Sequence, residues 1–151
     1  MAGPGATGGG SLEAALNSRV SASAALVKVG FLEGATYPDG TPVAQVAAWN
    51  EYGTTRSPMR DFFRSMIRAK GPKWGEELAR VLKTTGGDVP KALALMGERI
   101  SDQLTQSIVE FSDPPNAKLT VDKKGFNQPL LNTGTMQRSA GYEVDEGKIE
   151  L

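Results

Sequence analysis

The stretch Pro42–Arg64, PVAQVAAWNEYGTTRSPMRDFFR, decides the fold. Apolar residues recur at helical spacing from Val43 to Trp49 or Asn50. The pattern ends at Gly53, because glycine readily takes the left-handed conformation that closes a helix. The first half of the stretch therefore predicts a helix with a defined end.

The second half of the same stretch predicts a bend followed by a new helix. Pro58 disfavours helical backbone at Ser57, yet proline suits the first turn of a helix, so we expect the second helix to begin near Met59. Aromatic residues flank the bend on both sides. We expect a rigid corner that anchors two elements and presents arginines outward, with nothing typical of an active site.

Outward from the corner, the sequence predicts a strand at 25–32, since Val27, Val29 and Phe31 alternate with Lys28 and Gly30. A turn follows at 37–40, YPDG, and Thr41 is expected to cap the corner's first helix with Pro42 at its first position. Glycine-rich residues 1–10 lead into a short predicted helix that Ser11 caps. One face of this helix is apolar and is formed by Leu12, Ala15 and Leu16. We expect the helix to be ordered only when a neighbour packs against it.

Two longer helical patterns follow the corner. The first carries an apolar stripe that Gly71-Pro72 is expected to interrupt and that ends at Gly86-Gly87. Asp88 then caps a second helix, which is the candidate for the main core helix and which Ser112 to Pro115 should end. Its apolar positions, three and four residues apart, are Leu93, Met96, Ile100, Leu104, Ile108 and Phe111.

The C-terminal region is predicted to be mostly turn and strand. Residues 116–135 are polar and rich in turn residues, with a helical turn at 119–123 and an ordered loop at 129–136 that packs Leu130, Leu131 and Met136. Alternation at 140–144 predicts a strand, and 145–147, DEG, predicts a hairpin turn into a return strand at 148–151.

Together these patterns predict an α+β fold: a small antiparallel sheet packed against two or three helices. We expect residues 1–20 to be a flexible arm and 21–151 to form one domain.

Composition narrows the class of function. The chain has 151 residues, of which 39% are hydrophobic and 18 are glycine, and it contains neither cysteine nor histidine. Disulfides, thiolate nucleophiles, histidine bases and the commonest metal ligands are therefore missing. We expect no enzyme, no metal and no cofactor. No apolar run approaches the roughly 18 residues that span a bilayer, and a secretory signal is not evident at the N-terminus, so we expect maturation in a reducing cytosol.

The charges sum to zero, but they are segregated. Residues 56–83 hold eight Lys or Arg against three Asp or Glu, whereas 139–151 hold one lysine against four acids. A neutral total argues against general nucleic-acid affinity, whose main contribution is phosphate neutralisation. A basic middle and an acidic end suit head-to-tail contact between copies. The alternative is that these charges lie on solvated faces.

Three groups of side chains are candidates for function. Arg60, Arg64 and Arg68 are spaced four apart and predict a basic ridge on one helical face, either contacting a partner or pairing locally with acids such as Asp61. The second group is aromatic and consists of Trp49, Tyr52 and Trp74. We expect it to belong to the core, although a tryptophan beside a glycine corner can anchor an interface. The third group is acidic and consists of Asp39, Glu51 and Asp61; its spacing brings no site together, so we expect these residues to serve in solvated caps and turns.

Four ordered motifs resemble a known family. They are a V-G-F strand at 29–31, the segment AAWNEYGT at 47–54, PMRDFFR at 58–64, and KGFNQPLLNTGTMQRS at 124–139. In these motifs the chain resembles the small neck or tail-completion proteins of long-tailed bacteriophages, over roughly residues 27–145. Two departures stand out: Asp61 lies where the family usually has proline, and Ala140 lies where isoleucine is common.

The resemblance implies a structural, non-catalytic virion protein made in the host cytoplasm. Proteins of that family form a homo-oligomeric ring in the phage neck, between head-tail adaptor proteins and tail-terminator or tail-tube proteins. The candidate interface residues are Trp49, Tyr52, Arg56, Arg60, Arg64 and Arg68. The alternative function is a DNA-binding module that uses the basic segment from Arg56 to Lys73, and in a neck this segment could also face passing DNA.

Overall fold

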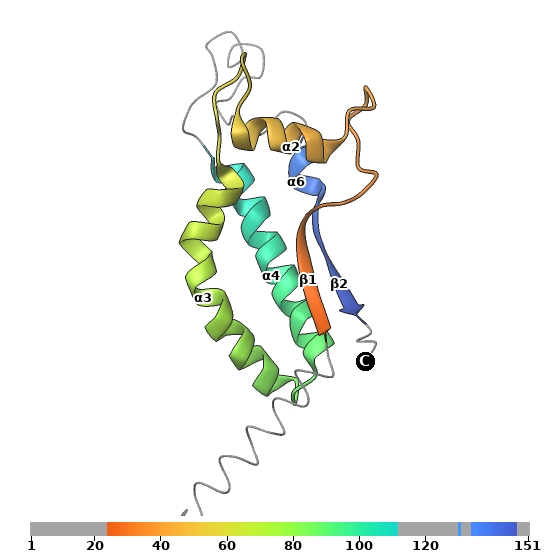
Figure 1. Cartoon of the computed structure of the whole chain (residues 1–151), viewed down its shortest axis with the longest axis vertical. Coiled ribbons are helices and arrows are strands. Elements are labelled where there is room, and N and C mark those ends of the chain that lie inside the picture. Colours follow the sequence, from red (N-terminus) through yellow and green to blue (C-terminus); the bar gives the residue numbers. More distant parts are fainter. Residues whose placement is uncertain (1–23, 112–129, 131–133, 148–151) are drawn as a thin grey trace, which may run out of the picture.

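The computed structural model describes residues 24–111, 130 and 134–147, and it has the predicted α+β architecture. Helices account for most of the described secondary structure, and a two-stranded antiparallel ribbon supplies the sheet (Figure 1). In chain order the elements are β1 (Ala24–Phe31), α2 (Val43–Tyr52), α3 (Phe62–Thr84), α4 (Val89–Glu110), α6 (Thr135–Arg138) and β2 (Ala140–Gly147).

The ribbon joins the two ends of the described chain. β1 and β2 pair antiparallel with Val29 opposite Tyr142, so strands more than a hundred residues apart in sequence lie side by side. The alternation predicted for β1 is confirmed, with Val27, Val29 and Phe31 half-buried and Lys28 exposed. The hairpin turn predicted at 145–147 is wrong. Those residues continue β2, since β1 supplies backbone partners along all eight positions, and the predicted return strand falls outside the described residues.

Helix α4 lies between α3 and the ribbon and contacts both (Figure 1). Its start is as predicted: Asp88 is the N-cap, and Asp88 Oδ1 accepts a hydrogen bond of 3.1 Å from the Lys91 N–H. The prediction of a main core helix is confirmed. Its members Leu93, Met96, Leu104 and Ile108 are buried, whereas Ile100 and Phe111 pack at the edge of the core.

Glycine at position 97 lets α4 pack closely on the ribbon. A Cβ built on Gly97 would lie 2.6 Å from the Tyr142 ring and 2.7 Å from Val27 Cγ2. Both distances are far inside van der Waals contact, so this crossing needs a residue without a side chain. Helix and ribbon are thereby packed more closely than any larger residue would permit.

Helix α3 is continuous, so the interruption predicted at Gly71-Pro72 is wrong. Proline costs the helix a hydrogen bond, but tertiary contacts hold the segment on both sides of it. Met66 is buried before Pro72, and after it the Trp74 Nε1–H donates to Gln103 Oε1 of α4 at 2.8 Å. Packing against α4 therefore outweighs the local preference of proline.

Helix α2 lies across the end of the ribbon (Figure 1) and differs from prediction at its start. Pro42 is the N-cap and no side chain caps the helix, so the predicted Thr41 cap is wrong. The Thr41 N–H instead donates to Asp39 Oδ1 at 2.9 Å, which commits this residue to the turn before the helix. The end is as predicted, because Gly53 has a φ of +76°.

The core lies where α2, the start of α3 and the end of α4 meet. Phe62, Leu104, Ile108 and Val43 are its largest fully buried side chains. Leu130 and Met136 join the same cluster, as expected for the loop at 129–136, and short helix α6 carries Met136. The third member predicted for that loop, Leu131, lies outside the described residues, as do the helical turn at 119–123 and the stop at 112–115. Among the described residues, none of the helices has the length and apolar composition of a membrane span.

Candidate interface at the α2–α3 corner

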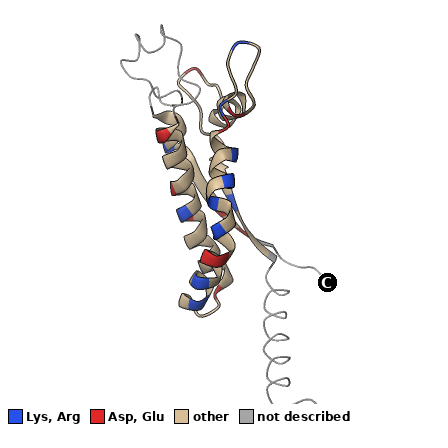
Figure 2. Cartoon of the chain, turned by 90° about the vertical axis from the view of Figure 1, so that its left-hand side faces the viewer, with Lys and Arg blue, Asp and Glu red and all other residues tan. Residues whose placement is uncertain are grey.

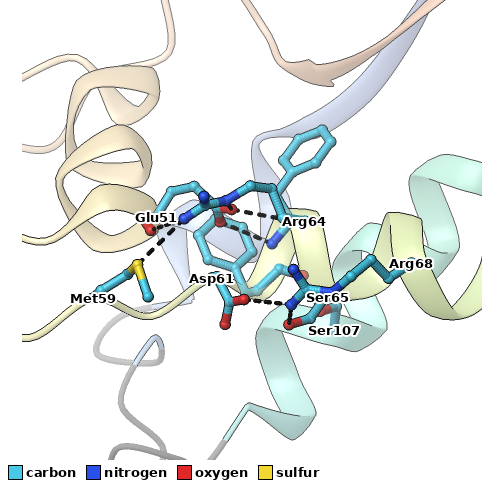
Figure 3. A network of polar contacts seen from close by, with 9 residues as sticks. Glu51, Met59, Asp61, Arg64, Ser65, Arg68 and Ser107 are labelled. Atoms are coloured by element: carbon cyan, nitrogen blue, oxygen red, sulfur yellow. Dashed lines mark hydrogen bonds and ion pairs between the residues drawn. The ribbon is translucent and has the colours of Figure 1, made fainter.

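Glu51, near the end of α2, caps the start of α3 (Figure 3). Its carboxylate accepts hydrogen bonds from the Phe63 N–H to Oε2 at 3.0 Å and from the Arg64 N–H to Oε1 at 3.1 Å. The side chain of Asp61, the residue in the local cap position, caps nothing. A negative charge at a helix N-terminus is stabilised by the free N–H groups and the helix dipole. Glu51 thus joins two helices, which is why it is buried with a relative exposure of 6%.

Arg64 completes the connection from the α3 side. Its Nε donates to Glu51 Oε1 at 2.7 Å, and its Nη2 donates to the Glu51 backbone oxygen at 3.0 Å. The guanidinium also lies over the Tyr52 ring, 4.9 Å from the ring centroid. The hydrogen bond with Glu51 raises the pKa of Arg64 above its ordinary value. Arg64 therefore links α3 to α2 within the corner, whereas the sequence predicts that its side chain points outward.

Arg60 is buried, so the predicted ridge of three arginines is wrong. α3 begins at Phe62, after Arg60 and later than the predicted start near Met59. Backbone bonds hold the loop before α3 in place of a helical turn: the Arg60 N–H donates to the Asn50 oxygen at 2.6 Å. Burial lowers the pKa of Arg60. This arginine belongs to the scaffold of the corner.

Arg68 forms a local pair, which is the alternative that the sequence left open. Its Nη2 lies 2.5 Å from Asp61 Oδ2 and 3.1 Å from Ser65 Oγ (Figure 3). The hydrogen bond from Arg68 lowers the pKa of Asp61. The pair lies at the surface, where such contacts contribute little to stability. Arg56, the remaining arginine of the predicted set, is exposed in the loop between α2 and α3.

An apolar groove lies between α2 and α3. It has a volume of about 310 Å³ and is lined mainly by alanines of α2 and apolar residues of α3. Tyr52 at its edge is 69% exposed, and Ile67 is 41% exposed. Trp49 on α2 is 46% exposed, so the expectation that Trp49 and Tyr52 belong to the core is wrong, whereas Trp74 is half-buried. The corner therefore presents aromatic and aliphatic surface to solvent.

The basic residues of this region extend along α3. The helix carries six Lys or Arg against two Glu, and Figure 2 shows the basic positions distributed along its length. Beyond Arg68, the exposed members are Lys70, Lys73, Arg80 and Lys83. The basic surface thus lies further along α3 than the arginines singled out in the sequence.

Separate contacts hold the three acidic side chains Asp39, Glu51 and Asp61. Within residues 24–111, 130 and 134–147, no three acidic side chains gather into a possible metal site. Asp39 accepts from its own turn, and Asp61 pairs with Arg68. The function of Glu51 as a cap between helices was missed, because its two backbone donors lie 12 and 13 residues further along the chain.

No family model, curated protein or solved structure matches the chain.

Proposed function

We propose that this chain is a structural subunit of a bacteriophage neck, which forms a homo-oligomeric ring joining the head-tail connector to the tail. The family resemblance of the four sequence motifs suggests this role. The observation that supports it best is the exposed apolar surface at the α2–α3 corner, which includes Trp49 and Tyr52. Exposed aromatic residues are the side chains that most often anchor protein interfaces.

The corner is also rigid enough to act as a docking surface. Glu51 fixes α2 to α3 through two backbone donors and Arg64. The loop between the helices is closed by Thr54, whose Oγ1 accepts from the N–H groups of Arg56 and Ser57 at 3.2 and 3.0 Å. A surface that is ordered before binding loses little conformational entropy when a partner docks. This property favours an assembly role for the exposed side chains.

The distribution of charge supports contact between unlike faces. α3 has an excess of four positive charges, six basic residues against two acidic, whereas β2 carries Glu143 and Asp145 on exposed positions. A basic face on one copy and an acidic face on the next attract one another in a head-to-tail contact. Contacts of this type close into rings when the rotation between copies permits it.

Two measurements test this proposal. Electron microscopy of purified phage particles with antibody labelling should place the chain at the neck, and its absence from mature particles would refute the virion role. Native mass spectrometry should show a closed oligomer that Tyr52→Ala or Trp49→Ala weakens. Leu95→Ala is the control, because Leu95 is 44% exposed, close to the 46% of Trp49, but lies on α4, away from the corner.

The basic surface of α3 supports a second candidate, which is contact with DNA. Arg64 and Arg68 are engaged in ion pairs, so Lys70 and Lys73 are the better candidates for phosphate contacts. Duplex binding should weaken as salt rises, and each lost phosphate contact should lower the slope of log K against log salt by about 0.9. If binding is absent at low salt, or if Lys70→Gln/Lys73→Gln leaves the slope unchanged, this candidate is excluded.

A further inference from the structure

We infer that the apolar groove between α2 and α3 binds the segment Leu12–Val20 of a second copy of this chain. This inference deepens the proposed ring, because it names the element that one subunit would place on the next. The inference rests on three observations: the shape of the groove, the apolar pattern of the segment, and the length of chain between the segment and β1.

The groove suits an amphipathic helix with aliphatic side chains. Ala44 and Ala48 lie one turn apart on α2 and both line the groove, so α2 presents a surface without large side chains there. Phe63 and Ile67 of α3 form the opposite wall, and Tyr52 lies at the rim. An apolar cleft between two helices is a common docking site for the apolar face of a third.

The segment has the matching pattern. In SLEAALNSRV, residues 11–20, Leu12, Leu16 and Val20 recur every four residues and predict one apolar stripe on a helix. Ser11 is a favourable N-cap, and Glu13 in the first turn complements the helix dipole. A helix of about ten residues is marginal alone in water, so it needs an apolar surface on which to pack.

Chain length argues against the copy's own segment as the occupant. Phe31, the last residue of β1, lines the groove, whereas Ala24 lies at the other end of the strand (Figure 1). Seven steps at about 3.3 Å place Ala24 roughly 23 Å from Phe31. Only residues 21–23 connect Val20 to Ala24, a reach of at most about 14 Å. The C-terminal end of the predicted helix therefore cannot enter the groove of its own chain, but it can enter that of a neighbour.

Disulfide trapping tests this contact without background, because the chain has no cysteine. Leu16→Cys is combined with Ala48→Cys in the full chain and mildly oxidised. The matched control combines Leu16→Cys with Ala79→Cys, since Ala48 and Ala79 are both exposed alanines on helices but Ala79 does not line the groove. Circular dichroism confirms that both variants keep the helical content of the parent chain.

A head-to-tail contact should give a ladder of covalent oligomers extending beyond the dimer, several-fold stronger for the Ala48 variant than for the Ala79 control. Equal ladders, no cross-linking, or a cross-link only within one chain would overturn the inference. A ring that assembles without this cross-link leaves the neck proposal standing and removes only the arm contact. Conversely, a strong ladder from a protein that is absent from phage particles keeps the contact and removes the neck role.

Discussion

Replacing Glu51 by glutamine should destabilise the fold far more than the loss of one surface charge would. The carboxylate uses both oxygens: Oε2 accepts from the Phe63 N–H, and Oε1 accepts from the Arg64 N–H and Nε. In the Glu51→Gln variant one oxygen becomes an NH2 donor, which must face a donor. Whichever way the amide is oriented, at least one N–H at the start of α3 loses its acceptor.

The magnitude follows from three contributions. An unsatisfied donor in a part-buried site costs about 1–3 kcal/mol. Removing the negative charge from the N-terminus of α3 costs about 0.3–1 kcal/mol more. Arg64 keeps 43% of its side chain exposed, so water can replace part of its lost ion pair and the penalty for that group is small. We expect a loss of about 2 kcal/mol for Glu51→Gln and about 3 kcal/mol for Glu51→Ala, which also loses packing.

Urea unfolding measures this change directly. With a slope of about 2 kcal/mol per molar urea, a loss of 2 kcal/mol lowers the midpoint by about 1 M. Glu98→Gln is the control, because Glu98 is exposed on α4 and its change should stay within about 0.5 kcal/mol. Hydrogen exchange should show lost protection at the amide of Phe63, of Arg64, or of both. A Glu51→Gln variant as stable as the control, with both amides still protected, would refute the capping argument.

Three further changes test other parts of the structure. Gly97→Ala should lower the free energy of unfolding by about 1–3 kcal/mol, measured by thermal unfolding, because its Cβ would overlap the tyrosine ring of β2. The control Gly75→Ala has open space around it and should be neutral or stabilising. Equal effects of the two substitutions would contradict the close approach of α4 to the ribbon. Gly53→Ala should cost about 1–3 kcal/mol in urea unfolding because of its positive φ and a 2.9 Å contact with the loop backbone, and an unchanged midpoint would argue against this corner geometry. The pKa of Asp61 is lowered by Arg68, so its stabilisation is present above its ordinary value of 3.8 and is lost as pH falls through the lower folded value. Asp61→Asn should therefore reduce stability at pH 7 by no more than about 1 kcal/mol, and this loss should shrink as pH falls through the lowered pKa of Asp61. A loss that does not change with pH would show that the charge is not involved.

The candidate site was only partly predictable. The sequence indicated a helix–bend–helix corner with exposed basic residues, and the structure places a corner there. It predicted Arg60 and Arg64 on an outer ridge, yet one is buried and the other is bound to Glu51. Helical spacing gives the direction of a side chain only where the helix exists, and Arg60 precedes the helix. For Trp49 and Tyr52 the sequence favoured the core and kept an interface as the alternative, since hydrophobicity alone does not say whether a neighbour covers a residue.

Local chemistry alone determined several features of this protein. The Asp88 cap, the buried stripe of α4, the alternation of β1 and the end of α2 at Gly53 each depend on residues within a few positions of one another. The pattern that predicts each feature is local in sequence, so it can be recognised without knowing which distant segment packs against it.

Tertiary structure alone decided the features that join distant segments. Packing on α4 keeps α3 continuous through Pro72, and pairing with β1 turns the predicted hairpin of residues 145–147 into strand. Capping by Glu51 fixes the corner from another helix. In each case a partner far along the chain supplies a hydrogen bond or an apolar surface that outweighs the local preference, and no local pattern encodes which partner arrives.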